Sequence, residues 1–252
     1  MTAYIAALFR HPIKGFTPEK VKLAQLVAGE AFPGDRLYAL EDGPSGFDPA
    51  APAWISKQRF AVLAKIAEVA KAKTRLDDAT GVLRADAEGM RPFAGKLTQA
   101  ADREAFAAWA SELLGEAAQG PLRLLDGAGW RFLDHPLGHV SVINLASVRD
   151  LEQRLGRSLD PLRFRANLYV EGWPAWAEND WEGRALTLGG AQAKVFKPIV
   201  RCAAPDVNPE TADRDAEVTT ALFDNYGHTH CGIYLHVTEG GLVREGDAVE
   251  AT

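Results

Sequence analysis

Short stretches of alternating apolar and polar residues run through most of the chain, and this period of two predicts β-strands. YIAALF (4–9) alternates only weakly but still indicates a first strand, and a second strand is expected at 37–40, after the turn signal FPGD (32–35). Residues 42–53 are rich in glycine, proline and aspartate, which predicts a loop. Within 60–76 we expect a short helix followed by a strand.

A turn at DDATG (77–81) and a strand at VLRAD (82–86) complete this part of the chain. The clearest helix is DREAFAAWASELLG (102–115), where we expect Asp102 to cap the start and Gly115 to end the last turn. The residues that fall on its apolar face are Phe106, Trp109 and Leu113.

A second helix is expected to begin at Ser147, because SVRD (147–150) resembles a capping box with aspartate in place of glutamate. Beyond it, short strand-like stretches alternate with glycine, proline and aspartate. The expected strands are FRANLYV, ALTL, AQAKVF, GIYLHV and AVEA. Strands thus dominate both halves with few helices between them, and we predict an α+β fold with barrel-like sheets.

Composition narrows the class of protein. The chain has 252 residues, of which 47% are hydrophobic and 25% charged, so it can bury a core as one large domain or two small ones. The net charge is −6 and no Lys/Arg run occurs, which argues against a nucleic acid or an anionic membrane as partner. No apolar stretch is long enough for a transmembrane helix, and the first residues lack a signal-peptide pattern. With only two cysteines, we expect a cytoplasmic protein with reduced thiols.

Cys202 is the first candidate for chemistry. It follows a predicted strand in KPIVRCAAPDVNPET (197–211), with Arg201 beside it. A guanidinium stabilises the neighbouring thiolate, and the thiolate is the form that attacks electrophiles or binds soft metals. The alternative is a buried cysteine that packs as a small apolar side chain, and the residues alone leave both open.

A second pattern consists of cations at loops and strand ends. Lys14 lies in HPIKG, Arg36 follows the FPGD turn, and Arg165 lies in RFRAN with Asn167 two residues on. If these side chains converge, they suit a phosphate or another polyanionic group, because guanidinium presents a planar fork of donors. The alternative for each is an ordinary solvated surface charge.

Two further clusters have more than one interpretation. In HTHC (228–231), His228 and His230 would share one face of a strand, but Cys231 would point to the other. We therefore expect a cluster packed at the start of a strand rather than a zinc site. The tryptophan-rich segment EGWPAWAENDW (171–181) would either line a substrate mouth or pack around a proline turn.

Several motifs follow one another in an order that is characteristic of one family. They are HPIKG (11–15), Gly34-Asp35-Arg36, LASVRDL (145–151), FRAN (164–167), AENDWEG (177–183), Arg201-Cys202 with Asn208-Pro209, and the ending from Tyr234 to Val237 and from Gly241 to Asp247. With these motifs, the sequence resembles MOSC-domain proteins that carry an N-terminal β-barrel domain. It is similar to the mitochondrial amidoxime-reducing component family and its bacterial homologues over nearly the whole chain.

This resemblance implies a smaller β-barrel-like N-terminal domain (1–118) packed on a β-barrel-rich MOSC domain (119–252). It also implies a pyranopterin molybdenum cofactor, with Cys202 as the metal ligand and catalytic residue. The residues that would bind the cofactor are Lys14, Gly15, Arg36, Arg165, Asn167, Arg201 and Tyr234. The chain departs from the family pattern at Gly15, which stands where the family has serine, and at His11, which stands where it has tyrosine.

The activity that the resemblance implies is reduction of small N-hydroxylated compounds such as amidoximes, hydroxylamines or hydroxylaminopurines. Electrons would come from a separate donor protein, such as a flavin reductase, a ferredoxin or a b-type cytochrome. Two alternatives stay open: a carrier of the molybdenum cofactor, and a sulfur-transfer protein with a persulfide on Cys202. The sulfur-transfer alternative has less support, because this sequence does not contain the pyridoxal-phosphate domain that accompanies MOSC domains in cofactor sulfurases.

Overall fold

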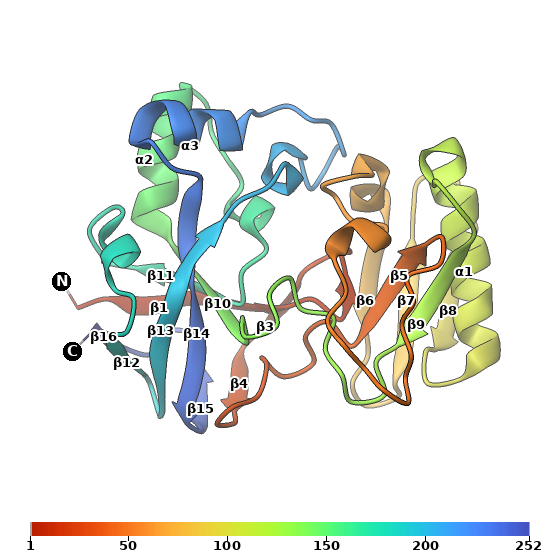
Figure 1. Ribbon diagram of the computed structural model, residues 1–252, viewed down its shortest axis with the longest axis horizontal. Coiled ribbons are helices and arrows are strands. Elements are labelled where there is room, and N and C mark those ends of the chain that lie inside the picture. Colours follow the sequence, from red (N-terminus) through yellow and green to blue (C-terminus); the bar gives the residue numbers. More distant parts are fainter. Residues whose placement is uncertain (1, 252) are drawn as a thin grey trace.

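Strands make up most of the regular structure in the computed structural model, which describes residues 2–251. The molecule is elongated, with a sheet-rich body at each end and both chain termini at the same end (Figure 1). The larger body is built on an eight-stranded sheet. In spatial order its strands are β16 (Val249–Ala251), β12 (Ala185–Leu188), β13 (Ala191–Val200), β14 (His230–Glu239), β10 (Val140–Asn144), β11 (Leu168–Glu171), β1 (Tyr4–Arg10) and β3 (Glu19–Val21).

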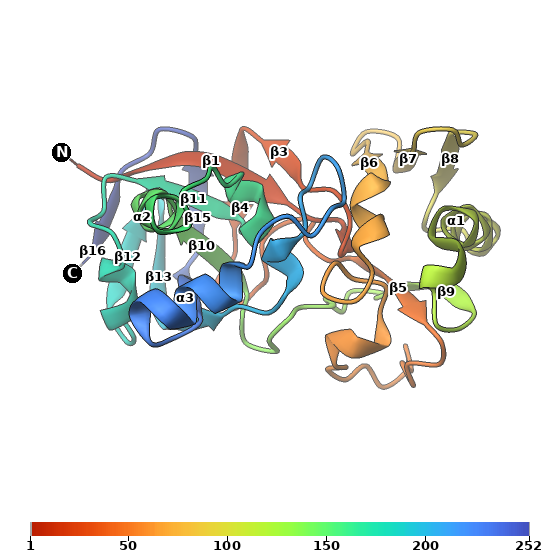
Figure 2. The same ribbon diagram turned by 90° about the horizontal axis from the view of Figure 1, so that it is seen from above.

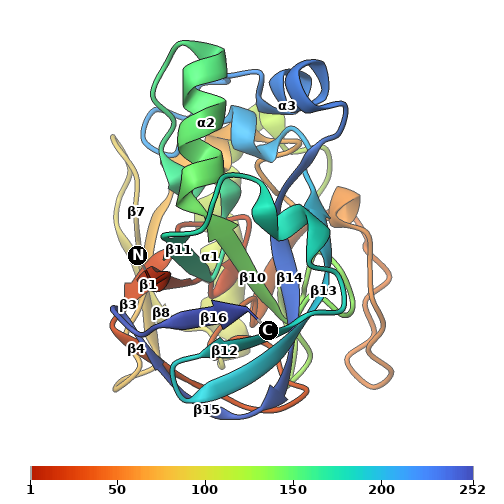
Figure 3. The same ribbon diagram turned by 90° about the vertical axis from the view of Figure 1, so that its left-hand side faces the viewer.

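The sheet is buried on both faces at its centre, where all five residues of β10 are buried and successive side chains point to opposite sides. On β10, Val142 packs into the core inside the curled sheet, whereas Ile143 packs under helices. The helices are α2 (Leu145–Leu155) and α3 (Val218–Tyr226), which lie together over the upper ends of the strands (Figure 3).

The first strands of the chain belong to this larger body. β1 pairs antiparallel with β11, and β4 (Leu23–Leu26) pairs antiparallel with β15 (Gly241–Arg244). The N-terminal residues thus complete sheets formed mostly by the C-terminal half. The predicted division of the chain at residues 118 and 119 stays a prediction.

The smaller body consists of two three-stranded sheets and one long helix, and it lies beside the larger body when seen from above (Figure 2). The helix packs its buried side chains, Phe106 and Trp109 among them, on a core that also contains Phe16 and Leu83. The elements are β2 (Ile13–Lys14), β5 (Tyr38–Asp42), β9 (Leu122–Asp126), β6 (Lys73–Leu76), β7 (Val82–Asp86), β8 (Phe93–Lys96) and α1 (Ala100–Leu114).

Many of the predicted elements are confirmed. The strands expected at 4–9, 37–40 and 82–86 correspond to β1, β5 and β7, and those expected after the second helix correspond to β11, β12, β13, β14 and β16. Residues 43–53 contain neither helix nor strand. Gly115 ends α1 as predicted, with a φ of 50°. Among the described residues no helix is both long and apolar enough to cross a membrane.

The predicted N-caps are wrong for both helices. α1 begins at Ala100 after Gln99, and the Asp102 carboxylate instead accepts the backbone N–H of Lys96 at 2.7 Å. α2 begins at Leu145, where the Asn144 side chain accepts the N–H of Ala146 at 3.0 Å. In α1 the Gln99 side chain makes no capping hydrogen bond, whereas in α2 the cap is Asn144, three residues before Ser147.

Three further segments differ from the expectations. The helical turn within 60–76 is a 3₁₀ segment at Ala67–Lys71 (η2) rather than at the start of that stretch. The FRANLYV strand begins only at Leu168, because a 3₁₀ turn at Pro161–Phe164 (η4) precedes it. The sequence analysis did not predict α3.

Candidate functional site

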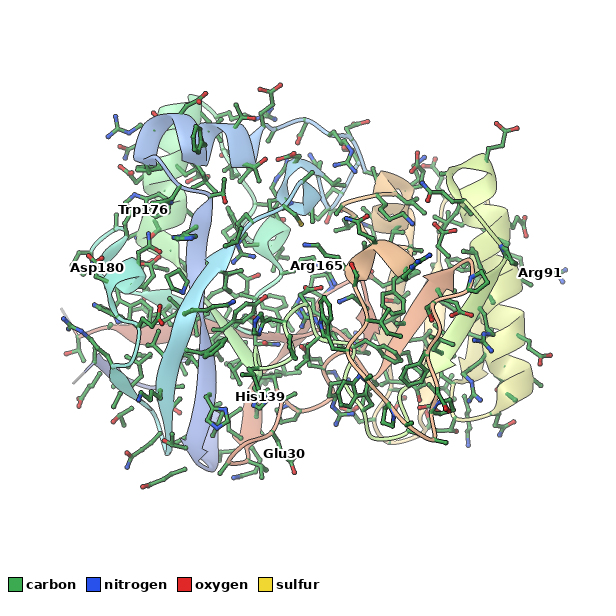
Figure 4. The ribbon with its side chains drawn as sticks, in the orientation of Figure 1. Glu30, Arg91, His139, Arg165, Trp176 and Asp180 are labelled. Atoms are coloured by element: carbon green, nitrogen blue, oxygen red, sulfur yellow. The ribbon has the colours of Figure 1, made fainter. Side chains whose placement is uncertain are left out.

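The predicted cations converge at one place, and Arg165 among them lies near the centre of the molecule (Figure 4). Lys14, Arg36 and Arg165 line a small hollow of about 50 Å³, and Cys202 forms part of its wall. A second hollow of about 70 Å³ adjoins the first and shares Arg36, Arg165 and Cys202 with it. Together the hollows match a phosphate-sized group rather than enclosing a whole pyranopterin.

Lys14 is held at the end of the short strand β2 and is only 2% exposed. Its ammonium donates to the carbonyl oxygen of Phe132 at 3.0 Å and to the Asp134 carboxylate at 2.5 Å. Burial lowers the pKa of Lys14, and the Asp134 charge opposes that shift. The lysine is thus fixed at the junction of the two bodies with one carboxylate as its counter-charge.

Arg36 has a left-handed backbone with a φ of 48°, and its guanidinium donates to the carboxylate of the preceding Asp35. The other Asp35 oxygen accepts the backbone N–H of His11 at 2.6 Å and lies 3.1 Å from His11 Nδ1. Burial opposes ionisation of Asp35, but Arg36 and His11 outweigh it and hold the pKa of Asp35 well below its usual range. This buried triad of His11, Asp35 and Arg36 orients the guanidinium at the hollow.

Arg165 follows η4 and also has a left-handed backbone, with a φ of 53°. Burial and the nearby Arg36 charge lower its pKa to about 10. Its Nη2 atom is buried and has no hydrogen-bond partner among the described residues. A buried guanidinium nitrogen without a partner is costly, so this atom indicates that an acceptor from outside the chain binds here.

Gly15 lines the first hollow with a φ of +90°, a conformation that side-chain-bearing residues rarely adopt. A Cβ atom at this position would lie 2.8 Å from the carbonyl oxygen of Ala61 and 3.1 Å from Val62 Cα. The glycine therefore lets the 61–62 backbone pack closely against position 15, and a serine side chain would be strained there.

The Arg201 guanidinium makes its hydrogen bonds to backbone carbonyl oxygens of neighbouring segments. Its Nε donates to the carbonyl oxygen of Cys231 at 2.8 Å, and its Nη1 donates to that of Phe164 at 2.8 Å. The guanidinium also lies over the Phe164 ring, 5.3 Å from the centroid. These contacts tie the segment before Arg165 to β14, and so they position Arg165 and the half-buried Cys202 relative to each other.

The two remaining predicted residues differ in their placement. Asn167 lines neither hollow: its Oδ1 accepts from the backbone N–H and hydroxyl of Ser141 at 3.0 and 2.9 Å, and its Nδ2 donates to Phe9. Tyr234 does line the second hollow, and burial raises its pKa to about 12. Asn167 therefore does not reach the second hollow itself but holds Ser141, which lines it.

Sequence reasoning missed two residues of the site, Asp134 and Lys57, which line both hollows. Asp134 lies 3.8 Å from Arg36 Nη2 in addition to its contact with Lys14. Burial opposes its ionisation, but Lys14 and Arg36 hold the pKa of Asp134 well below its usual range. Both residues lie in polar, loop-like segments, where no motif distinguished them.

The electrostatic balance of the site favours an anion. Lys14, Lys57, Arg36 and Arg165 surround the hollows, whereas Asp35 and Asp134 are their carboxylate neighbours. Cations thus outnumber carboxylates, and the excess suits a phosphate monoester, which carries about two negative charges at neutral pH.

The HTHC cluster lies outside these hollows. The rings of His228 and His230 stack with 5.0 Å between centroids. They do not share a strand face as expected, because β14 begins at His230 and His228 lies in the bend before it. Cys231 is fully buried under the helices, and burial raises its pKa to about 12. The rings of Trp176 and Tyr226 pack together with 4.4 Å between their centroids. No group of three or more His, Cys, Asp or Glu within residues 2–251 has the geometry to hold a metal ion.

Two protein-family models match the chain. The MOSC N-terminal beta barrel domain matches residues 2–120, and the MOSC domain matches residues 131–250. Over 143 residues, 52% of this chain, the sequence is 34% identical to the molybdenum cofactor sulfurase of Drosophila erecta. Over 120 residues, 43% of this chain, it is 30% identical to mitochondrial amidoxime-reducing component 1 of Mus musculus.

These matches cover only part of the curated relatives, 17% of the sulfurase and 35% of the amidoxime-reducing component. Among solved structures, the YuaD protein from Bacillus subtilis aligns over 100% of this chain and 96% of its own, with a TM-score of 0.46 and 14% identity.

Proposed function

Since the chain belongs to the MOSC-domain family, we propose that it is a molybdenum-cofactor-dependent oxidoreductase that reduces N-hydroxylated compounds. The substrates would be amidoximes, hydroxylamines or hydroxylaminopurines, and the electrons would come from a separate donor protein. The similarity to an amidoxime-reducing component supports the reaction class. The similarity to a cofactor sulfurase supports the cofactor and keeps sulfur transfer as an outcome of the test.

The observation that carries the proposal is the unpartnered Nη2 of Arg165, which lies in a cation-rich hollow with Cys202 in its wall. A phosphate oxygen is the acceptor that this nitrogen lacks, and the surplus of cations matches its charge. The cysteine supplies the soft thiolate that a molybdenum centre favours. The residues of this chain therefore fit a cofactor that carries both a phosphate and a soft metal.

In this proposal Lys14, Arg36 and Arg165 hold the phosphate, and Gly15 lines the same hollow. Arg201 positions the Cys202 ligand, and Tyr234 closes the second hollow with its ring. When bound, the cofactor supplies the two-electron chemistry that removes the hydroxyl oxygen of an N–OH group as water. The chain contributes orientation, charge neutralisation and exclusion of bulk water from the Cys202 wall.

Metal analysis tests this function. We would purify the protein from a host that synthesises molybdopterin, and compare it with Cys202→Ala and with the matched control Cys231→Ala. We expect near-stoichiometric molybdenum in the parent and in Cys231→Ala, loss or alteration of the metal in Cys202→Ala, and reduction of an amidoxime by the parent with a chemical reductant.

Each other outcome contradicts the oxidoreductase proposal in its own way. Bound molybdenum without turnover of any N-hydroxylated compound would make the protein a cofactor carrier. A persulfide on Cys202, detected by mass spectrometry without bound molybdenum, would make it a sulfur-transfer protein. If the parent protein contains neither molybdenum nor a persulfide, Cys202 is a structural residue that packs as a small apolar side chain.

A further inference from the structure

A second, larger cavity lies on the other side of the segment that carries Asp134. Its volume is about 470 Å³, within the range of pockets that bind small organic molecules. Leu133 and Pro136 flank Asp134 in the chain and line this cavity, whereas Asp134 itself lines the hollows near Cys202. The cavity is therefore a separate site, and the proposed function assigns nothing to it.

Two tryptophans give the cavity aromatic walls. Trp54, in the loop before η1 (Lys57–Arg59), is 45% exposed, and Trp130 is half-buried. An exposed tryptophan leaves a large apolar surface in water, and a flat ring stacked on it removes that surface from solvent. Aromatic side chains bind planar heteroaromatic rings in this way without requiring one particular ring.

The polar groups of the cavity define the rest of the ligand. Among the described residues the Arg131 guanidinium has no ion pair and no side-chain hydrogen bond, so it is free to bind a carboxylate or phosphate. His139 Nδ1 is buried and likewise lacks a partner in the described chain. Glu30 lies near His139 at the same cavity (Figure 4) and accepts hydrogen bonds from N–H or O–H groups.

We propose that this cavity, defined by Trp54, Trp130, Arg131, His139 and Glu30, binds a planar heteroaromatic compound that carries an anionic group and an N–H donor. The ring lies against the tryptophans, the anionic group binds Arg131, and the remaining polar edge meets His139 and Glu30. The charged or polar side chains of Arg131, His139 and Glu30 in the lining are what favour such a ligand over a purely apolar one.

Isothermal titration calorimetry of the full chain tests the site with three probes. Indole-3-carboxylate has the flat ring, the N–H and the charge; indole-3-carboxamide lacks the charge; cyclohexanecarboxylate lacks the flat ring. We expect indole-3-carboxylate to bind most tightly, Trp54→Ala to weaken it about tenfold, and Arg131→Gln to weaken it about tenfold while leaving indole-3-carboxamide unchanged.

Two variants serve as controls. Arg91→Gln removes an exposed arginine at the far end of the smaller body (Figure 4), and Arg165→Gln removes a cation of the other site. Both should bind indole-3-carboxylate like the parent, and Trp54→Ala should keep the parent's melting temperature because the ring is exposed. Absence of binding at millimolar concentration, equal binding by Trp54→Ala and the parent, or loss of binding in Arg165→Gln would each overturn the proposal.

Discussion

The ammonium of Lys14 lies 2.5 Å from a carboxylate oxygen of Asp134, although 120 positions separate the two residues in the chain. Lys14 comes from the first strands of the smaller body, and Asp134 comes from the segment that leads into the larger one. The pair therefore brings a carboxylate into a cluster that otherwise attracts anions. The Lys14 side chain is 2% exposed and that of Asp134 is 40% exposed, so the pair joins a buried ammonium to a carboxylate that solvent reaches.

Replacement of Arg165 should weaken anion binding. In cofactor-free protein we expect Arg165→Gln to lower the affinity for inorganic phosphate by at least about tenfold, since one charge-assisted hydrogen bond contributes about 1.5–3 kcal/mol. Isothermal titration calorimetry at low ionic strength measures the affinity. Arg91→Gln, which removes an exposed charge far from the site, is the matched control. An unchanged phosphate affinity in Arg165→Gln would show that the unpartnered nitrogen of Arg165 takes no part in anion binding.

Replacement of Asp134 should strengthen phosphate binding rather than weaken it. Asp134→Asn removes a negative charge beside Lys14 and Arg36 while nearly preserving side-chain volume. We expect phosphate to bind several-fold more tightly, by about 1 kcal/mol, and the gain to shrink as salt screens the site. The same calorimetric titration, repeated at two salt concentrations, checks both parts. Weaker binding in this variant would show that the carboxylate organises Lys14 rather than competing with the anion.

Restoring the family serine should destabilise this protein. Gly15→Ser places a Cβ 2.8 Å from the Ala61 carbonyl oxygen at a φ of +90°, so backbone has to move. We expect the free energy of unfolding to fall by about 2–4 kcal/mol. The matched control is Gly89→Ser, at a φ of +75° with open space around it, which should cost about 1 kcal/mol. Urea denaturation compares them, and equal losses would rule out crowding at Gly15 as the cause.

His11 should make stability depend on pH. Burial lowers its pKa to about 4, so below its ordinary pKa of about 6.5 the unfolded chain binds a proton that the folded chain does not. This contribution to stability is present at neutral pH and is lost as the pH falls from about 6.5 towards 4. It amounts to about 2 kcal/mol between pH 7 and pH 5.

The comparison variant is His11→Asn, whose Nδ2 can donate to Asp35 in place of the histidine Nδ1 but does not titrate. Urea denaturation at both pH values should show a smaller pH-dependent loss in His11→Asn than in the parent. If the two proteins lose equal stability, other groups are responsible for the acid sensitivity.

Local patterns in the sequence were sufficient for most strands and for the cationic residues. The alternation in VLRAD predicted β7, because a period of two places one side of a strand in the core. YIAALF also predicted a strand, but the buried residues of β1 are Ile5 and Leu8, because the register of β1 shifts between Ile5 and Ala7. Helix starts were less predictable. Asn144 and Ser147 both have side chains able to cap α2, and both donate a hydrogen bond to Glu178. The Asn144 oxygen accepts the N–H of Ala146, whereas the Ser147 oxygen accepts the N–H of Trp176 from a distant segment, so Asn144 is the cap.

The chemistry of the candidate site divides in the same way. The sequence by itself determined which groups are available: a cysteine beside an arginine, and cations at the ends of strands and turns. Only the tertiary structure decided that Asp134 and Lys57 join these groups. It also decided that the Asn167 side chain is hydrogen-bonded to Ser141 and that one nitrogen of Arg165 lacks a partner among the described residues. The physical reason is that residue type sets charge and hydrogen-bonding capacity locally, whereas convergence and burial depend on how two bodies formed from distant segments pack together.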